Sequence, residues 1–314
     1  MFGARFDDAG SGRSFMLKNN LREIVASEAS EVVGAIRSAA KEAAVGNWVA
    51  GYVTFDAAPG FDDALVVQDG YNGPLVWFGV FGDSVDVDPP CVTPTTAEGY
   101  SVSRWVPAYD RTQYGSAFTA VLRHIELGDS YQVNLTFPFR AAFSGQAESM
   151  YADLISAQQG RYAAHLWHDD THIVSASPER FFSVKGGRIA TRPMKGTAPR
   201  GRSPSEDEAE RQNLGSSEKN RAENLTIVDL IRNDLGRIAE FGTVTVDELF
   251  TVEQYRTVWQ MVSEISATLR PDADDVLCVN ERGRVTESTI ANVVFLIDGE
   301  WVTPPVSDGL LPGI

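Results

Sequence analysis

The chain has 314 residues, of which 43% are hydrophobic and 22% charged, a composition typical of a globular protein of about two domains. Acidic residues outnumber basic ones by 43 to 27, and the resulting net charge of −16 repels phosphate backbones, which argues against a nucleic-acid partner. There is no run of about 18 apolar residues and no apolar core of a signal peptide, so the sequence predicts a cytoplasmic protein that binds no membrane.

Strands in runs and helices in runs follow one another along the chain. The β-rich or alternating stretches are 48–55, 75–81, 131–139, 161–167, 172–184 and 187–192. Among them, Asp110 and Gln113 form a capping box that predicts a helix ending at Gly128. Ser203 followed by Pro204 predicts an acidic, exposed helix. This order favours an α+β fold over a doubly wound parallel sheet.

The segment 177–201, SPERFFSVKGGRIATRPMKGTAPRG, holds the densest group of reactive side chains. Gly186 and Gly187 lie between two β-rich runs and predict a hairpin. The hairpin would bring Glu179 and Lys195 onto neighbouring strands, with a carboxylate and an amine facing a shared space. A lysine whose pKa is lowered by burial can act as a nucleophile, and the alternative is a surface lysine beside a turn.

A further helix is predicted over residues 223–238. Its apolar side chains recur at helical spacing: Leu225, Val228, Ile231, Leu235 and Ile238. Glu223 and Asp234 border this stripe, where a carboxylate needs a cation, a metal or a hydrogen-bonded partner. The two acids are about 16 Å apart along the axis and cannot share one metal ion. Magnesium on Glu223 would take its other ligands elsewhere in the fold or from substrate oxygens, and for each acid the alternative is an arginine partner.

Other common site patterns are missing from the sequence. The four histidines form no HxxxH pair and no Ser/His/Asp spacing, so structural or surface roles are expected for His124, His165, His168 and His172. There is no GxGxxG motif and no P-loop, so neither a dinucleotide site nor a phosphate cradle of those kinds is predicted.

Five motifs occur in an order that resembles the chorismate-utilising enzymes. They are YQVNLT (131–136), SPERFF (177–182), PMKGT (193–197), AENLTIVDLIRNDLGRI (222–238) and VWQMVSEI (258–265). The likeness is greatest to the aminodeoxychorismate synthases of folate and 4-aminobenzoate biosynthesis, in the form fused to a lyase. It implies an α/β sandwich with large, mostly antiparallel sheets and flanking helices, here truncated, that binds chorismate and Mg²⁺.

The resemblance also implies roles for single residues. Glu179 matches the family's general acid/base, and Lys195 matches the lysine that attacks C2 of chorismate. Gly196 and Thr197 would line the substrate pocket, and Glu223 would bind magnesium. Trp259 stands where many relatives carry a histidine.

The C-terminal part resembles a different enzyme. No GAPK turn follows the last motif, and residues 279–314 are similar to a late segment of aminodeoxychorismate lyase, which uses PLP. Glu287 matches the acid that holds the pyridinium nitrogen of PLP. In this chain it would be a vestigial PLP contact. No lysine follows Lys219, so productive PLP binding is not expected. We expect a fused synthase–lyase that lacks an internal stretch and the end of the lyase.

The predicted function is amination of chorismate to 4-amino-4-deoxychorismate, impaired in this chain. No glutaminase motif surrounds Cys91 or Cys278, so ammonia would come from a glutamine amidotransferase subunit. The expected parts are an N-terminal subdomain (1–100), a catalytic region (101–275) and a lyase-like fragment (276–314). The alternatives are an anthranilate or isochorismate synthase, and a non-catalytic remnant.

Overall fold

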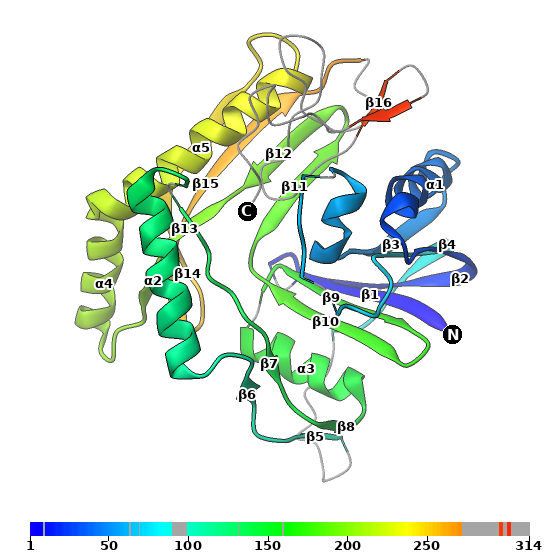
Figure 1. The fold of residues 1–314 in the computed structure, drawn as a ribbon, viewed down its shortest axis with the longest axis horizontal. Helices are drawn as coiled ribbons and strands as arrows, with labels where there is room; N and C mark the ends of the chain where they lie inside the picture. Colours follow the sequence, from blue (N-terminus) through cyan, green and yellow to red (C-terminus); the bar gives the residue numbers. More distant parts are fainter. Residues whose placement is uncertain are drawn as a thin grey trace. The chain divides into compact units, whose positions relative to one another are not determined.

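The computed structural model describes residues 1–8, 10–62, 64–68, 70–89, 99–130, 132–158, 160–271, 295–297 and 300–302. The chain divides into two compact units (Figure 1). One combines Met1–Cys91 with Leu154–Gly313, and the other is Val92–Asp153. The sequence predicts boundaries near residues 100 and 275. These boundaries separate functional parts of the chain, not compact units, and they stay a prediction.

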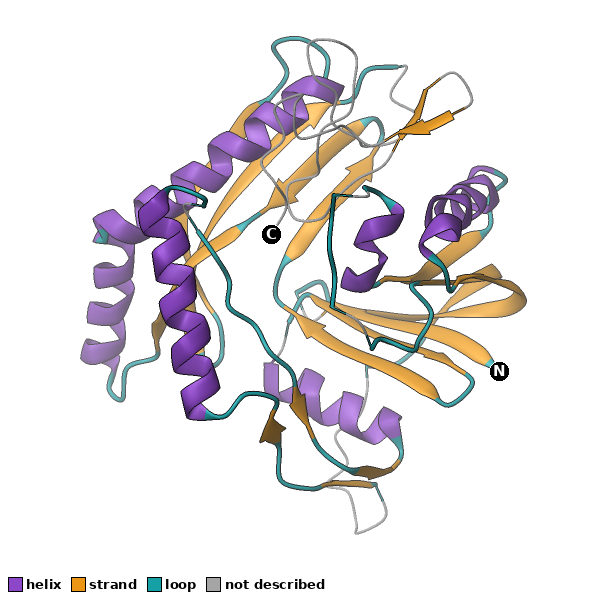
Figure 2. Ribbon diagram, in the orientation of Figure 1, coloured by secondary structure: helices purple, strands orange, loops and turns teal. Residues whose placement is uncertain are grey.

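The first sheet of the larger unit has six antiparallel strands in the order β10–β9–β1–β2–β4–β3 (Figure 2). The strands are β1 (Phe2–Asp8), β2 (Arg13–Ala26), β3 (Trp48–Val53), β4 (Val76–Asp86), β9 (Tyr162–His168) and β10 (Thr171–Ser177). Successive side chains point to opposite faces. Val76 and Val80 therefore pack against α1 (Val32–Ala44) and the short helix η2 (Phe55–Gly60), while Trp77 and Phe81 form an aromatic core on the other face. A second short helix, η1 (Ala29–Glu31), directly precedes α1.

The second sheet of the same unit is built around β15 (Val258–Thr268). The other strands are β11 (Arg180–Lys185), β12 (Arg188–Arg192), β13 (Met194–Pro199) and β14 (Thr245–Gln254). β12 pairs with the second half of β15 and β13 with its first half, so the two lie end to end along one side of β15. β14 pairs along the other side, and β11 pairs with β12 at the edge.

Two helices cover one face of this second sheet. α5 (Glu218–Ile238) lies along the sheet (Figure 1). It buries Val228, Ile231, Leu235 and Ile238 against β12 and β15. α4 (Pro204–Ser216) packs Leu214 against Trp259, Met261 and Ala198. Burial of such apolar side chains, roughly 1.5–3 kcal/mol each, is what holds the helices to the sheet.

The smaller unit contains α2 (Arg111–Leu127) and two short strand pairs. β5 (Tyr100–Val102) pairs with β8 (Phe143–Gly145), and β6 (Val106–Pro107) pairs with β7 (Phe139–Arg140). α3 (Ala147–Gln158) begins in this unit. Towards the end of the chain, the backbones of β16 (Phe295–Ile297) and β17 (Glu300–Val302) pair antiparallel. Among the residues described, no helix is long and apolar enough to cross a membrane.

The predicted helices are confirmed, with two refinements. Asp110 caps α2 reciprocally with Gln113, and Gly128 ends it in a left-handed conformation with φ of 81°. Ser203 accepts from the N–H of Glu206 at the start of α4, but the Glu206 carboxylate accepts from the N–H of Arg202 rather than from that of Ser203.

A second refinement concerns α5. The predicted apolar stripe included Leu225, and this part of the prediction is wrong. Leu225 is exposed, and the buried face begins at Asn224 instead. The reason is the hydroxyl of Ser263 on β15, which donates to Asn224 and holds that side chain inward.

The predicted strands are confirmed in part. Residues 172–184 form two strands, β10 and β11, separated at Pro178 and Glu179, because proline has no N–H for the ladder. Of the run 131–139, residues 132–138 form no strand, and only Phe139 belongs to one. Every described strand pair is antiparallel, as the α+β prediction requires.

Candidate active site

The hairpin between β11 and β12 positions Glu179. Gly186 and Gly187 form its two-residue turn with φ of 58° and 74°, values that glycine adopts without strain. Glu179 directly precedes β11, and its Oε1 accepts from the N–H of Met194 at 3.2 Å, at the start of β13. Burial raises the pKa of Glu179, against the opposing effects of this hydrogen bond and the positive charge of Lys195.

Lys195 lies in a β-bulge. The pairing of β13 with β15 shifts register between Met194 and Thr197, so Lys195 and Gly196 stand outside the regular ladder. Gly196 has φ of 93°, and a Cβ there would lie 3.0 Å from the Cβ of Asn220. β-bulges often re-aim a side chain beside an active site. The predicted arrangement is found in part: Glu179 directly precedes β11 and accepts from Met194, the residue before Lys195, but β13 pairs with β15 rather than with β11. That the amine and the carboxylate face a shared space stays a prediction.

Thr197 and Gln260 form the next contact along β13. The Thr197 hydroxyl donates to Oε1 of Gln260 at 2.7 Å. Trp259 points to the opposite face of β15, where it is buried under α4 and donates through Nε1 to Asp207 at 2.9 Å. Gln260 is therefore a site residue that the sequence reading missed, although strand alternation around Trp259 was a signal that could have indicated it.

Glu223 lies in the second turn of α5 and is half-buried. Its carboxylate is 3.8 Å from Nζ of Lys219, an exposed pair at i,i+4 spacing. Among the described residues, Glu223 belongs to no group of three side chains that could hold a metal ion. The sequence left open that Glu223 pairs with an arginine. Its observed partner is Lys219, and this weak pair is worth a few tenths of a kcal/mol.

Asp234 is more deeply buried than the helical wheel indicates. It is 5% exposed rather than at the boundary, and no arginine of the described part of the chain forms an ion pair with it within 4.0 Å. Burial raises its pKa to about 6, although Arg237 and a hydrogen bond from Asn233 act in the opposite direction. Asp234 therefore belongs to the interface between α5 and the sheet, at a distance from Glu223.

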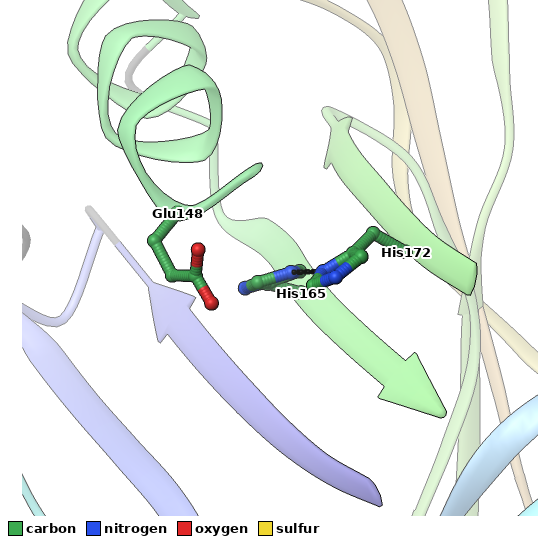
Figure 3. Close-up of side chains that lie close together, drawn as sticks. All are labelled: Glu148, His165 and His172. Carbon is green, nitrogen blue, oxygen red and sulfur yellow. Dashed lines mark hydrogen bonds between the residues drawn. The ribbon is translucent and has the colours of Figure 1, made fainter. Parts of the chain in front are cut away.

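The histidines have structural or surface contacts, as predicted. His165 and His172 are joined through Nε2 and Nδ1 at 2.9 Å on adjacent strands (Figure 3). Glu148, which is also drawn there, belongs to the other compact unit. His168 contacts the Tyr52 hydroxyl at 2.9 Å, and His124 pairs with Asp129 at the surface.

Some predicted residues lie outside the described part of the chain. These are Glu287, the proposed PLP contact, and both cysteines, Cys91 and Cys278.

Comparison with known proteins identifies relatives for most of the chain. The protein is 42% identical over 176 residues to aminodeoxychorismate synthase component 1 of Klebsiella aerogenes, an alignment that covers 56% of this chain and 39% of that protein. It is 44% identical over 167 residues to the protein of the same name from Escherichia coli K12, covering 53% and 37%. The chain thus spans about two fifths of the length of these curated relatives.

Solved structures show the same fold. Anthranilate synthase component I from Streptococcus pneumoniae matches with a TM-score of 0.69 at 21% identity, over 87% of this chain and 71% of that one. A putative 2,3-dihydroxybenzoate-specific isochorismate synthase from Bacillus anthracis matches with a TM-score of 0.64 at 18% identity, covering 86% and 69%. Residues 266–314 match the amino-transferase class IV family, in agreement with the predicted fusion to a lyase. The model of the chorismate binding enzymes matches residues 6–281, and the chain therefore belongs to that family.

Proposed function

We propose that the chain is the chorismate-aminating component, component I, of an aminodeoxychorismate synthase. It would convert chorismate and ammonia to 4-amino-4-deoxychorismate. The observation that carries this proposal is the hydrogen bond that the half-buried carboxylate of Glu179 accepts from the N–H of Met194, the residue before the bulged Lys195. The names of the relatives at 42% and 44% identity support it.

The two side chains divide the chemistry between a nucleophile and an acid. The neutral amine of Lys195 bonds to C2 of chorismate while the C4–oxygen bond breaks, and the carboxylic acid of Glu179 gives its proton to the departing hydroxyl, which leaves as water. Ammonia then bonds to C4, the bond from C2 to Lys195 breaks, and the Glu179 carboxylate takes the surplus proton. A raised pKa suits Glu179 to give and regain a proton.

Magnesium fits Glu223 in part. Mg²⁺ is usually held by one or two carboxylates together with waters and substrate oxygens, and Glu223 offers one carboxylate that is held only by an exposed lysine. Glu223 would bind the ion with a carboxylate of the substrate, and the ion would neutralise the charge of that substrate group. Displacement of Lys219 from its 3.8 Å contact would free the carboxylate.

The proposal includes a partner and a location. Ammonia is released from glutamine by glutaminases, and a separate glutamine amidotransferase subunit would supply it, as the printed name "component 1" of the relatives implies for those proteins. A cytoplasmic location remains part of the prediction.

Replacement of Lys195 tests the proposal. Purified protein is incubated with chorismate, ammonium and Mg²⁺, and the product is identified by mass spectrometry. Lys195→Ala should abolish 4-amino-4-deoxychorismate formation, while Lys185→Ala, at the exposed end of β11, should retain it. Formation of anthranilate or isochorismate by the unaltered protein would instead support those synthases, and turnover by Lys195→Ala would contradict the covalent role.

A second candidate function is a non-catalytic remnant that binds chorismate or the glutaminase without turnover. One observation favours it: Glu223 belongs to no group of three potential metal ligands among the described residues. Binding of chorismate in a calorimeter, without product in the assay above, would distinguish this function from catalysis.

A further inference from the structure

His165 and His172 bring two imidazole rings together on one face of the first sheet. His165 lies on β9 and His172 on β10, and the register pairs His165 with Val174 and His172 with Trp167. The two histidines are therefore diagonal neighbours on the same face, within reach of each other's rings. They are seven residues apart in the sequence, a spacing without a metal-binding signature, so the pairing of the strands is what brings them together.

The two rings meet edge to edge. Nε2 of His165 and Nδ1 of His172 are 2.9 Å apart (Figure 3). The ring centres are 5.2 Å apart, and the ring planes are inclined by only 22°. That separation is nearly the distance between the nitrogens plus a ring radius at each end, so both nitrogens lie close to the line between the centres. Each ring therefore directs one nitrogen at the other ring, and one of these nitrogens donates while the other accepts.

One ring is held by packing, and the other is open to solvent. His165 is 1% exposed, and the ring of Trp167 lies beside it with the centres 5.0 Å apart. Trp167 in turn pairs with Gly3 on β1, where a Cβ would come within 2.1 Å of the Trp167 ring. His172 is exposed, so its ring has room to turn. A positioned ligand beside an exposed one gives an ion an entry path.

The charges beside the pair do not oppose a cation. Arg5 on β1 is the residue that pairs with His165 across the strands. Its guanidinium donates to both carboxylate oxygens of Asp7, at 2.8 and 3.0 Å. The charge of Arg5 is thereby balanced, and the chain as a whole carries −16. The field of the protein therefore favours a divalent cation over an anion.

We propose that His165 and His172 form a binding site for a divalent transition-metal ion such as Zn²⁺. Imidazole nitrogen is a good ligand for Zn²⁺, Ni²⁺ and Cu²⁺, whereas Mg²⁺ prefers oxygen ligands. The site is therefore separate from any magnesium on Glu223, and it does not rest on the proposed function. The two imidazoles are its protein ligands, since Glu148 belongs to the other compact unit, and water would fill the remaining positions.

The ion takes the place of the hydrogen that the two nitrogens share. For this the donor ring carries its hydrogen on its other nitrogen, a change of tautomer that imidazole allows. Zn–N bonds of about 2.0–2.1 Å at a tetrahedral angle put the two nitrogens about 3.3 Å apart. The observed separation is 2.9 Å, so a small turn of the exposed His172 ring opens the pair far enough.

Nitrogen NMR of the imidazole rings tests the site directly. The protein is prepared without a polyhistidine tag, which would bind the same ions. The chain has only four histidines, so each labelled ring can be assigned by single substitution. ZnCl₂ is added in the presence of excess Mg²⁺, which occupies oxygen ligands and leaves the imidazoles free. Calorimetry on the same samples gives the dissociation constant.

Two substitutions and one matched control identify the ligands. His172→Gln removes the exposed ring, and His165→Gln removes the buried one. His124→Gln is the control, because His124 is also exposed but its Nδ1 lies 2.8 Å from a carboxylate oxygen of Asp129 instead of a second imidazole. Thermal unfolding without zinc identifies the variants that are folded. Since His172 is exposed, His172→Gln should fold even if His165→Gln does not.

The expected result is saturation at one Zn²⁺ per histidine pair, with the largest shifts at Nε2 of His165 and Nδ1 of His172. His172→Gln should weaken zinc binding by at least about 10-fold, the loss that even an indirect ligand contact usually causes, and His124→Gln should leave it unchanged. If His165→Gln does not fold, His172→Gln alone decides. Zinc that shifts neither ring, or a His172→Gln protein that binds zinc as tightly as the unaltered one, overturns the proposal. An equal loss in His124→Gln does so as well.

Discussion

Asp234 is a carboxylic acid that the fold buries with no ion pair among the described residues. Its pKa is raised to about 6 from an ordinary value of 3.8, so the folded protein disfavours the charged form. Well below pH 3.8 the group is neutral in both the folded and unfolded chains and costs nothing. Between pH 3.8 and about 6 it ionises in the unfolded chain while it stays protonated in the folded one, so stability falls with rising pH, and above about 6 the loss is complete, on the order of 3 kcal/mol.

Asp234→Asn should therefore stabilise the protein at neutral pH. The amide has the shape of the acid but never ionises, so we expect the free energy of unfolding in urea to rise by about 1–3 kcal/mol at pH 8. The gain should shrink towards zero near pH 4. Asp229→Asn on the same helix is the control, because Asp229 is exposed and pairs with Arg232 at the surface. A gain that is independent of pH would contradict this explanation.

The reactive residues differ in how far the sequence determines them. The hairpin that follows Glu179 was predictable, because the two glycines at 186–187 specify its turn. The bulge at Lys195 was not, since a register shift depends on the partner strand and β15 lies more than 60 residues away. The same shift concealed the contact of Thr197 with Gln260.

At the scale of the element, the bulge in β13 depends on Gly196. Its φ of 93° is strained for any other side chain, and a Cβ would also press on the Cβ of Asn220 at 3.0 Å. Gly196→Ala should lower the free energy of unfolding by about 1–3 kcal/mol and displace Lys195, with loss of product formation. Urea denaturation and the chorismate assay measure the two effects.

A matched control is available at the turn of the β11–β12 hairpin. Gly186 also has a positive φ, of 58°, but a Cβ there meets nothing within 4 Å. Asparagine tolerates this conformation, so Gly186→Asn should change stability by only a few tenths of a kcal/mol. Equal losses in Gly186→Asn and Gly196→Ala would show that packing against Asn220 is unimportant.

The elements that the sequence predicts well carry their own end signals. α2 and α4 begin at capping side chains that bond to their own first turn, so their positions follow from local chemistry. The run 131–139 has strand-like alternation, but residues 132–138 pair with no described strand. Strand formation depends on a partner, and an alternating pattern alone does not supply one.

At the scale of the molecule, the candidate site has one identified carboxylate for magnesium, the lower end of the one or two that usually hold this ion. Glu223 offers one carboxylate, and no group of three potential ligands includes it among the described residues. We expect calorimetry in the presence of chorismate to show weak Mg²⁺ binding that disappears in Glu223→Gln. Glu218→Gln, exposed in the first turn of the same helix, should leave the binding unchanged. Tight binding, or binding that survives Glu223→Gln, would contradict the assignment.

The last part of the chain is similar to a family whose chemistry depends on a lysine, and this sequence places no lysine there. Residues 266–314 match the class IV aminotransferases, which leads one to expect PLP. PLP enzymes hold the cofactor as a Schiff base on a lysine amine, which also moves the proton. The lysines of the chain are Lys18, Lys41, Lys185, Lys195 and Lys219, and none lies within the matched segment.

Because the matched segment has no lysine of its own, the residues that match the lyase do not fit productive PLP binding. Glu287 can pair with a pyridinium nitrogen but cannot form the covalent bond. We expect that PLP added to the protein gives no discrete Schiff-base absorbance and that aminodeoxychorismate releases no pyruvate. Borohydride reduction and peptide mapping should find only scattered labelling of surface lysines such as Lys41 and Lys219. A single trapped adduct accompanied by pyruvate release would prove this expectation wrong.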